Sequence, residues 1–534
     1  MLTLGGLGAG CRARRRSGGV ASSSQEVAAV LPKRQPLTLL KPDIPGEGAL
    51  PDGYLAYPKE LVRLIHEKPG QSGDPITTMS AAWGPTPPGR GRNSFLDAVN
   101  AELGVPVEPS VQDGLTFAAK LSAVLGARDV PDLLSAPTWE IDKIPRFSQA
   151  VKALFTDLTE YLQGDAVNAY PMLATLPTAA WQYSVWGGRL AAVPYPTDGP
   201  FPWGLFYRKD LCDRAGVAAP TNIDELYQFG KRMTDPGRGV WGFGNIFHMV
   251  QMFFKCPGSS TGWRRRAGGG LEHKYETPEY RQALEFTRRL HGDGLVHPDV
   301  IASNGSDSKQ LFNAGKMICT QDGIGVWRGT QSEQAKITPG FNIQPIPLFS
   351  AVGGKPLAWT TESPIFYTFI RKGLSRERVQ ELLRVLNWCA APFGSREHEL
   401  NAHGVEGAHF TRAPDGSPLP TELGRKELAD QYRLLGGRVP TLVGTSDVPN
   451  FVTDLLAYSR TTLAYKEENP FLGVKMEYPP NYSRVIIPTE DKINDIVRGR
   501  RPLADLDQIV REWRSSGADE GRAFFEKVLS DNGR

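Results

Sequence analysis

The sequence contains histidines and carboxylates close together, but their spacing does not match the reactions that such residues support. His398, Glu399 and His403 occur in "HELNAH", where the two histidines are five apart and the HExxH order of a zinc protease is missing. No CxxC pair occurs either. Paired carboxylates that cut a glycosidic bond need only meet in space, so this kind of enzyme stays open. We predict no catalytic residue, no cofactor and no metal.

A cysteine near the N-terminus offers another chemistry, namely lipidation. Cys11 follows the small residues of "LGAG" and precedes four arginines within five positions. A dinucleotide-binding loop is disfavoured because "GLGAG" follows no strand and precedes no amphipathic helix. A disordered tail is the plain alternative. We interpret residues 1–11 as a truncated lipoprotein signal with Cys11 as the lipidated residue, because a diacyl group supplies the two chains that stable anchoring needs. No basic residue precedes the apolar stretch, so we expect the start codon to lie upstream.

Composition limits the remaining possibilities. The 534 residues carry a formal net charge of only +3, so no overall field favours nucleic acid as a partner. No apolar run approaches the ~18 residues of a membrane-spanning helix, so attachment to a membrane is expected only at a terminus. Four further cysteines lie far apart in the chain and are either buried thiols or two disulfides: Cys212, Cys256, Cys319 and Cys389.

The order of predicted elements indicates an α/β protein. Residues 12–73 are rich in proline, glycine and serine and predict a flexible linker. From residue 74 a strand is followed by the helix "NSFLDAVNAELG", the strand "VPVEPSVQ", a second helix and a third strand. This βαβαβ order favours a parallel sheet with helices on both faces. The C-terminal section is mainly helical.

Several stretches of the chain resemble extracellular solute-binding proteins of family 1, in particular the long, oligosaccharide-binding lipoprotein members that serve ABC importers. They are "WGGRLAAVPYPTDGPFPWGLFYRKDLCDRAGVAAPTNIDELYQFGKRM", "LFNAGKMICTQDGIGVW" and "ELLRVLNWCAAPFGSREHELNAHGVEGAHFT". The match runs in consistent order over residues ~74–530.

The resemblance implies a periplasmic-binding-protein-like type II fold, in which two α/β lobes are joined by a multi-strand hinge and ligand binds in the cleft between them. We expect crossings near "VPYPTDGPF", near residues 354–364 and between about residues 405 and 450. The expected segments are residues 74–195 (lobe 1), 198–356 (lobe 2), 360–410 (return to lobe 1) and 411–534 (lobe 2 and the C-terminal helices).

Tryptophans in loops at predicted strand ends are the candidate ligand-binding residues that this fold implies, because ligands of open α/β sheets bind there. Sugars have apolar faces ringed by hydroxyls, so aromatic rings stack on the faces while polar groups bind the rim. The aromatic candidates are Trp83, Trp203, Trp327 and Trp359. Core packing is the alternative for each.

Polar groups in the same loops are the candidate partners for sugar hydroxyls. They are Asp113, Asp198, Asp322, Glu362, Asp447 and Asn450, each of which could instead serve a turn or a helix cap. Some relatives carry a calcium loop where this chain has "TDPGRGVWGFG". Asp235 is present there, but an arginine replaces later oxygen donors, which argues against calcium.

The resemblance therefore implies a monomeric, lipid-anchored receptor on the extracellular face of a bacterial membrane. Its expected partners are a sugar or oligosaccharide ligand and the permease subunits of an ABC importer. Two alternatives remain: the same fold binding a non-sugar ligand such as a peptide, and a secreted carbohydrate-active enzyme.

Overall fold

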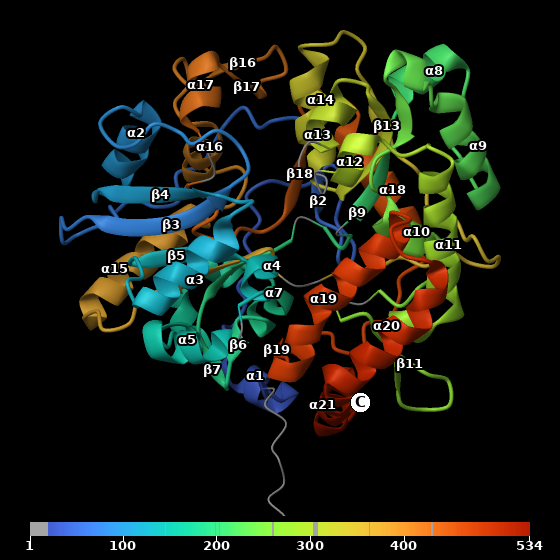
Figure 1. Cartoon of the computed structure of the whole chain (residues 1–534). Helices are drawn as coiled ribbons and strands as arrows, with labels where there is room; N and C mark the ends of the chain where they lie inside the picture. Colours follow the sequence, from blue (N-terminus) through green and yellow to red (C-terminus); the bar gives the residue numbers. More distant parts are fainter. Residues whose placement is uncertain are drawn as a thin grey trace, which may run out of the picture.

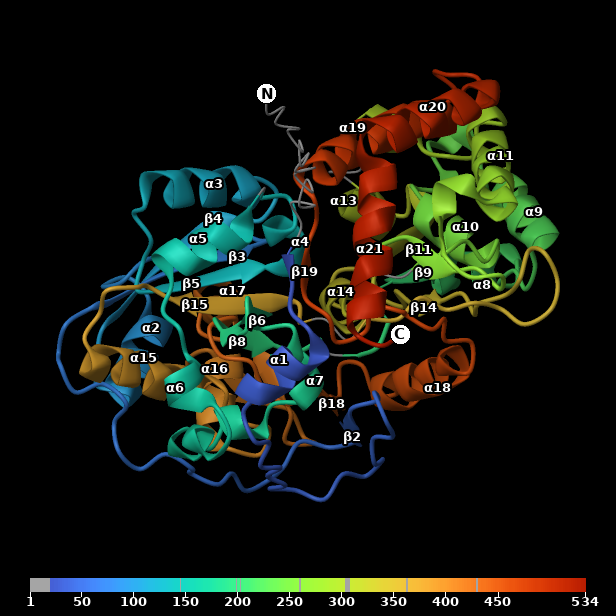
Figure 2. The ribbon, with the colours of Figure 1, turned by 90° about the horizontal axis from the view of Figure 1, so that it is seen from below.

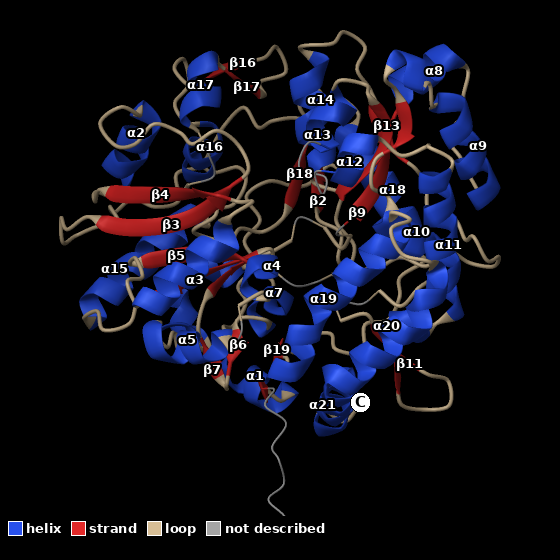
Figure 3. Ribbon diagram, in the orientation of Figure 1, coloured by secondary structure: helices blue, strands red, loops and turns tan. Residues whose placement is uncertain are grey.

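Two β-sheets, each covered by helices, divide the chain between two lobes (Figures 1 and 3). The computed structural model describes residues 20–144, 146–197, 199–201, 203–258, 261–302, 308–361, 364–428 and 431–534. The α/β fold class predicted from the sequence is confirmed.

Lobe 1 is built on a five-stranded sheet in the order β4-β3-β5-β15-β8. The first three strands of this sheet are parallel, as the βαβαβ pattern predicted, and β15 runs antiparallel to both β5 and β8. The bounds are β3 (Ile76–Ala82), β4 (Val107–Asp113), β5 (Leu133–Pro137), β8 (Val193–Tyr195) and β15 (Phe366–Ile370).

Helices cover both faces of the lobe 1 sheet and separate its core into two layers. One layer includes apolar residues of α2 (Ser94–Leu103) and α15 (Arg376–Cys389), and the other those of α3 (Phe117–Ala127) and α5 (Phe147–Leu154). The shorter elements of this lobe are α4 (Thr138–Ile141), α6 (Thr159–Leu162), α7 (Thr178–Gln182), β6 (Val185–Trp186), β7 (Arg189–Leu190), α16 (Arg396–His403), β16 (Phe410–Arg412), β17 (Pro418–Pro420) and α17 (Glu422–Glu427).

The sequence determines the ends of α2 directly. The Asn93 side chain accepts a hydrogen bond from the Leu96 amide, and Gly104 closes the helix with φ of 72°. That φ value suits glycine because it has no Cβ. The helix therefore spans the residues between these two caps and directs Phe95, Leu96 and Val99 into the core.

Lobe 2 is built on a four-stranded sheet in the order β10-β13-β9-β14. Its strands are β9 (Trp203–Arg208), β10 (Trp241–Phe243), β13 (Met317–Gly323) and β14 (Ile343–Pro345). The surrounding elements are α8 (Lys209–Ala215), α9 (Ile223–Met233), α10 (Phe247–Phe253), β11 (Trp263–Arg265), β12 (Leu271–His273), α11 (Pro278–Gly292), α12 (Pro298–Ala302), α13 (Ser308–Asn313) and α14 (Val326–Ala335).

The C-terminal helices complete lobe 2 (Figure 2). They are α18 (Phe451–Leu463), α19 (Pro480–Val497), α20 (Leu506–Trp513) and α21 (Asp519–Asp531). Trp513 of α20 stacks on Trp263 of β11, with ring centroids 5.9 Å apart. The Trp263 indole donates a hydrogen bond to the Tyr482 hydroxyl at 3.0 Å. The last part of the chain thus shares a core with residues some 200 positions earlier.

Three segments carry the chain between the lobes. The first joins β8 to β9, the second joins β14 to β15, and the third leads through β18 (Thr441–Val443) to α18. The third crossing begins later than the expected boundary at residue 411, because Tyr432 and Leu435 still belong to the lobe 1 core. The short elements before them, β16, β17 and α17, also belong to lobe 1, so burial of these apolar side chains decides the boundary.

Residues 20–73 differ from the flexible linker that their composition predicted. This segment forms β1 (Val20–Ala21), α1 (Ser24–Val30) and β2 (Asp52–Tyr54), and β2 pairs in parallel with β18. Buried carboxylates hold its irregular parts: Glu397 accepts hydrogen bonds from the Leu64 and Ile65 amides, and Glu381 from the Gln71 and Ser72 amides. Contacts with distant parts of the chain thus give this segment a defined structure that its composition does not predict.

Candidate functional site

A cavity of about 940 Å³ opens between the two lobes. Its walls come from the loop after β3, the start of α4, the first two crossing segments, the ends of β9 and β13, and lobe 2 elements as far as α19 and α20. Strand ends of both sheets therefore meet at one space, as expected for ligand sites of open α/β sheets.

Two exposed tryptophans form the lobe 1 wall. Trp83 follows β3 and Trp139 is the second residue of α4; their side chains are 52% and 43% exposed, and their ring centroids lie 5.6 Å apart. Phe366 supports both rings edge-on. A Cβ at Gly114 would lie 2.3 Å from the Trp83 ring, so this glycine lets the indole lie close to the neighbouring loop. The result is an apolar platform that faces the cavity.

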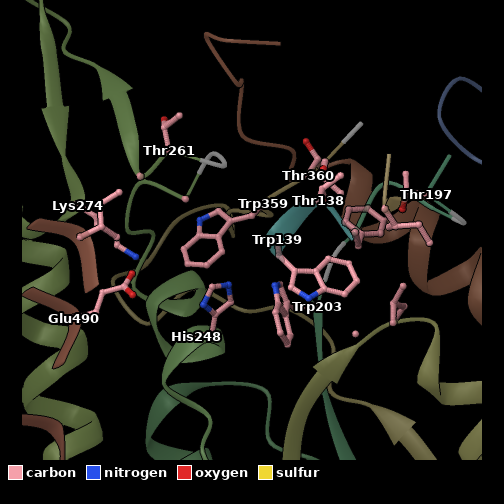
Figure 4. A pocket seen from close by; sticks show the side chains of 18 of the residues that line it. Thr138, Trp139, Thr197, Trp203, His248, Thr261, Lys274, Trp359, Thr360 and Glu490 are labelled. Carbon is pink, nitrogen blue, oxygen red and sulfur yellow. The ribbon is translucent and has the colours of Figure 1, made fainter. Parts of the chain in front are cut away.

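Three rings form the opposite wall (Figure 4). His248 of α10 lies between Trp203, the first residue of β9, and Trp359 of the second crossing, with ring centroids 5.0 Å and 4.7 Å away. Trp203 is 36% exposed, whereas Trp359 is only 4% exposed and donates its indole N–H to the Cys256 carbonyl at 3.0 Å. A Cβ at Gly258 would come within 1.6 Å of the Trp359 ring, so glycine is required there.

His248 acts as a neutral ring in this wall. Burial lowers the pKa of His248 to about 3, and the nearby charge of Lys274 adds to the effect. The Gln321 side chain accepts hydrogen bonds from the His248 and Met249 amides and holds the start of α10 against β13. An uncharged imidazole between two indoles can stack on a sugar face and offer one N–H or one lone pair to a hydroxyl.

Three charged side chains line the cavity among the described residues: Asp322, Lys274 and Glu490. Asp322 is the penultimate residue of β13 and accepts a hydrogen bond from the Gly323 amide at 2.7 Å, while burial raises its pKa. Burial lowers the pKa of Lys274 and raises that of Glu490, and each charge opposes the shift of the other. Figure 4 shows the Lys274 amine pointing toward the Glu490 carboxylate. The lining thus holds two carboxylates and one ammonium.

The structure brings four of the predicted site residues to this cavity: Trp83, Trp203, Asp322 and Trp359. Asp198 and Glu362, and also Cys11, lie outside the described residues. The other four candidates lie away from the cavity: Asp113, Trp327, Asp447 and Asn450.

Trp327 belongs to the core of lobe 2 and not to the cavity wall. It is 3% exposed, donates its indole N–H to the Ile343 carbonyl at 3.0 Å and packs on Phe206 and Phe451. The physical reason is that α14 begins at Val326 and turns this position inward. The loop expected to display it ends at Gly325.

The three polar candidates outside the cavity have structural roles. Asp113 accepts a hydrogen bond from the Leu115 amide at 2.7 Å, as in a turn. Asp447 accepts a hydrogen bond from the Ser332 hydroxyl, and Asn450 directly precedes α18. The corrected set therefore has fewer acidic groups at the ligand space than the loops suggested.

The lining residues that sequence reasoning missed include Trp139, His248, Lys274 and Glu490. The rule that picked out Trp83 would have found Trp139, since it follows the buried strand β5 by two positions. The other three come from elements whose contact with the cavity depends on tertiary packing. Glu490 in particular lies on the C-terminal helix α19, more than 200 residues from Lys274.

The described residues also bear on metal binding, disulfides and membrane spans. Within them, no group of three or more histidine, cysteine or carboxylate residues could hold a metal ion, and Asp235 caps a short helical turn through the Arg238 amide. The four cysteines from Cys212 onward are buried free thiols. In the same part of the chain, no helix is both long and apolar enough to span a membrane.

The class of protein follows from the two-lobed fold, the cavity between the lobes and the family match. Residues 85–386, more than half of the chain, match the bacterial extracellular solute-binding protein family. The chain therefore belongs to that family, and the resemblance noted in the sequence is confirmed.

Individual relatives are distant in sequence but similar in fold. The polygalacturonan/rhamnogalacturonan-binding protein YtcQ of Bacillus subtilis (strain 168) is 22% identical over 433 residues, which cover 77% of this chain and 82% of the relative. The calcium-free structure of the alginate-binding protein AlgQ2 superposes with a TM-score of 0.62 at 14% identity, covering 88% of this chain and 99% of that one. The FusA substrate-binding protein of Streptococcus pneumoniae, solved with kestose, gives 0.61 at 14% identity, covering 86% and 99%.

Proposed function

We propose that this protein is a receptor that binds an oligosaccharide between its lobes and delivers it to an ABC importer. The observation that carries the proposal is the pair of aromatic walls, one from each lobe, that face the same cavity: Trp83 and Trp139 on one side, Trp203 and His248 on the other. A sugar chain presents two apolar faces to such walls and its hydroxyls to the rim. The sugar-binding relatives support the same ligand class.

Closure of the lobes on the ligand is the mechanism we propose. The lobes connect through three crossing segments, so they can rotate about a hinge while their cores stay intact. A ligand that contacts both walls binds the closed form better and shifts the population toward it in proportion to that difference in affinity. The permease would then distinguish loaded from empty receptor by shape, and no bond needs to break.

The charges of the cavity favour neutral sugars in our proposal, although two relatives are named for acidic polysaccharides. Asp322 and Glu490 outnumber Lys274 among the described lining residues. Near Asp322 a uronate carboxylate would meet like charge in a partly desolvated space, which is costly. The carboxylates can instead accept hydrogen bonds from the hydroxyl groups of a neutral sugar.

Anchoring completes the proposal. We infer that Cys11 carries the lipid and that the receptor stands as a monomer on the extracellular face of the membrane. The family and the small residues before Cys11 support this placement. Mass spectrometry of the protein purified from the membrane fraction tests it: an added diacylglyceryl group on Cys11 supports the anchor, and an unmodified thiol contradicts it.

A thermal-shift screen tests the ligand class. The purified protein is mixed with neutral oligosaccharides, oligogalacturonates, oligoalginates and peptides, and each sugar is analysed afterwards for new reducing ends. We expect a neutral oligosaccharide to raise the melting temperature saturably and to be recovered intact. If only peptides stabilise the protein, the sugar proposal is wrong, and if the sugar is cut, the protein is an enzyme. Stabilisation by uronates alone would overturn the preference for neutral ligands.

A further inference from the structure

A second cavity, of about 350 Å³, lies where the lobes meet near the third crossing segment. Arg328 comes from α14 of lobe 2, His398 and His403 come from α16 of lobe 1, and Arg438 comes from the approach to β18. Figure 1 shows β18 between α14 and α16. None of these residues lines the sugar cavity. The second cavity is therefore a separate space held by both lobes.

The walls of this second cavity are strongly cationic. Three guanidinium groups line it, those of Arg328, Arg433 and Arg438, and no carboxylate of the described residues does. Hydroxyls of Thr441 and Thr445 and the amide of Asn401 add further polar groups. Cations gathered at a partly desolvated space repel one another and lose hydration, so they stabilise the fold only when an anion or another partner compensates them.

Arg328 has unused hydrogen-bonding capacity toward this space. Its Nη2 donates to the Thr445 hydroxyl at 3.2 Å, whereas its Nε is buried and makes no hydrogen bond to any described residue. Burial lowers the pKa of Arg328, and the charge of Asp447 opposes this shift without forming an ion pair with it, while the Asp447 carboxylate accepts a hydrogen bond from the Ser332 hydroxyl. Arg328 lines the cavity, and a planar guanidinium whose donors are not all used is suited to bind two oxygens of one anion.

The two histidines add polar groups to the cavity wall but no charge. Burial, followed by the nearby arginines, lowers the pKa of His403 to about 3 and that of His398 well below its usual value. Both rings are therefore neutral at physiological pH. The His398 ring already hydrogen-bonds the Ala391 backbone, so His403 is the ring that can offer its N–H to the cavity. These are the histidines of the "HELNAH" stretch, whose spacing excludes a zinc protease.

We propose that this cavity binds a small tetrahedral oxyanion of the phosphate or sulfate type, held by Arg328 and Arg438. Arginine is the preferred side chain for such anions because its fork of donors matches two adjacent oxygens. The volume admits the anion together with water, or a small phosphate monoester. Because the two arginines come from lobe 2 and from the crossing segment, and the histidines from lobe 1, the anion would connect both lobes at the hinge.

Isothermal titration calorimetry with inorganic phosphate tests the proposal on the full chain, in buffer of constant ionic strength. We expect one phosphate per chain, competition by sulfate and no competition by chloride. Arg328→Gln and Arg438→Gln should each weaken phosphate binding at least tenfold, while Arg438→Lys, which keeps the charge but loses the fork, should weaken it less. Arg376→Gln is the matched control, since this arginine pairs with Glu160 on the surface of lobe 1.

The melting temperature in chloride buffer reports whether each variant folds. If Arg328→Gln does not fold, Arg438→Gln and Arg438→Lys still decide the result. Absence of phosphate binding to the wild-type protein, binding that chloride abolishes, or binding that both folded glutamine variants retain would overturn the proposal and leave a water-filled cavity. Tighter binding of a phosphate monoester than of free phosphate would identify an organic phosphate as the natural source of the group. None of these outcomes depends on whether a sugar binds at the other cavity.

Discussion

Replacing Trp83 by alanine tests the lobe 1 wall of the sugar cavity. An indole side chain presents about 250 Å² in full, so 52% exposure leaves about 130 Å² open. A sugar ring covers one face, or about 60 Å², which at ~25 cal/mol per Å² contributes about 1.5 kcal/mol to binding. We therefore expect Trp83→Ala to raise the Kd of the best oligosaccharide about tenfold.

The assay is calorimetric titration of wild-type and variant protein with that oligosaccharide. Trp139→Ala should raise the Kd by a similar factor, because the Trp139 ring is 43% exposed on the same platform. Trp241→Ala is the control, since this tryptophan lies on β10 outside the cavity and packs on His297. If Trp83→Ala and Trp139→Ala keep their melting temperature and change the Kd less than twofold, the sugar does not stack on this platform and the reasoning fails.

Three further predictions concern the elements that position the site. Gly258→Ala should displace the Trp359 ring and raise the Kd for oligosaccharide at least tenfold, whereas Gly292→Ala, whose Cβ would meet open space, should leave it unchanged in the same titration. Trp327→Ala should lower the unfolding free energy by about 3–5 kcal/mol in urea titration, as expected for a buried tryptophan, and an unaltered midpoint would contradict its place in the core. The pKa of Glu381 is lowered to about 2, because its hydrogen bonds from backbone amides, a hydroxyl and Arg378 outweigh the desolvation that burial causes. The ionised Glu381 carboxylate therefore stabilises the fold above pH ~4.5, and this stabilisation is lost as the pH falls toward 2. The difference in unfolding free energy between wild type and Glu381→Gln should shrink from roughly 3 kcal/mol at pH 7 to below about 1 kcal/mol at pH 2, and a pH-independent difference would rule out this account.

The sequence predicted the parts of this fold that depend on local signals. Asn93 and Gly104 bound a helix because the Asn93 side chain caps its start and Gly104 readily takes the positive φ at its end. The alternation of strands and helices after residue 74 favours the parallel sheet. Trp83 was found because a loop that follows a buried strand lies at the edge of the sheet.

The remaining parts depend on contacts that no local pattern encodes. Residues 20–73 lack periodicity, yet Glu381 and Glu397, more than 300 positions away, accept their amide hydrogen bonds. Trp327 lies only two residues after Gly325, and the start of α14 at Val326 decides that its ring points into the core. Lys274 and Glu490 meet only because α19 packs against the middle of lobe 2.

Small-angle X-ray scattering with and without the bound oligosaccharide tests the central claim that one ligand contacts both lobes. Trp83 and Trp139 on one wall, and Trp203 and His248 on the other, should approach each other around the sugar. We predict that saturating oligosaccharide lowers the radius of gyration of the wild-type protein, and that Trp83→Ala requires proportionally more ligand for the same change. Saturable binding with an unchanged radius of gyration would contradict closure of the two lobes on the ligand.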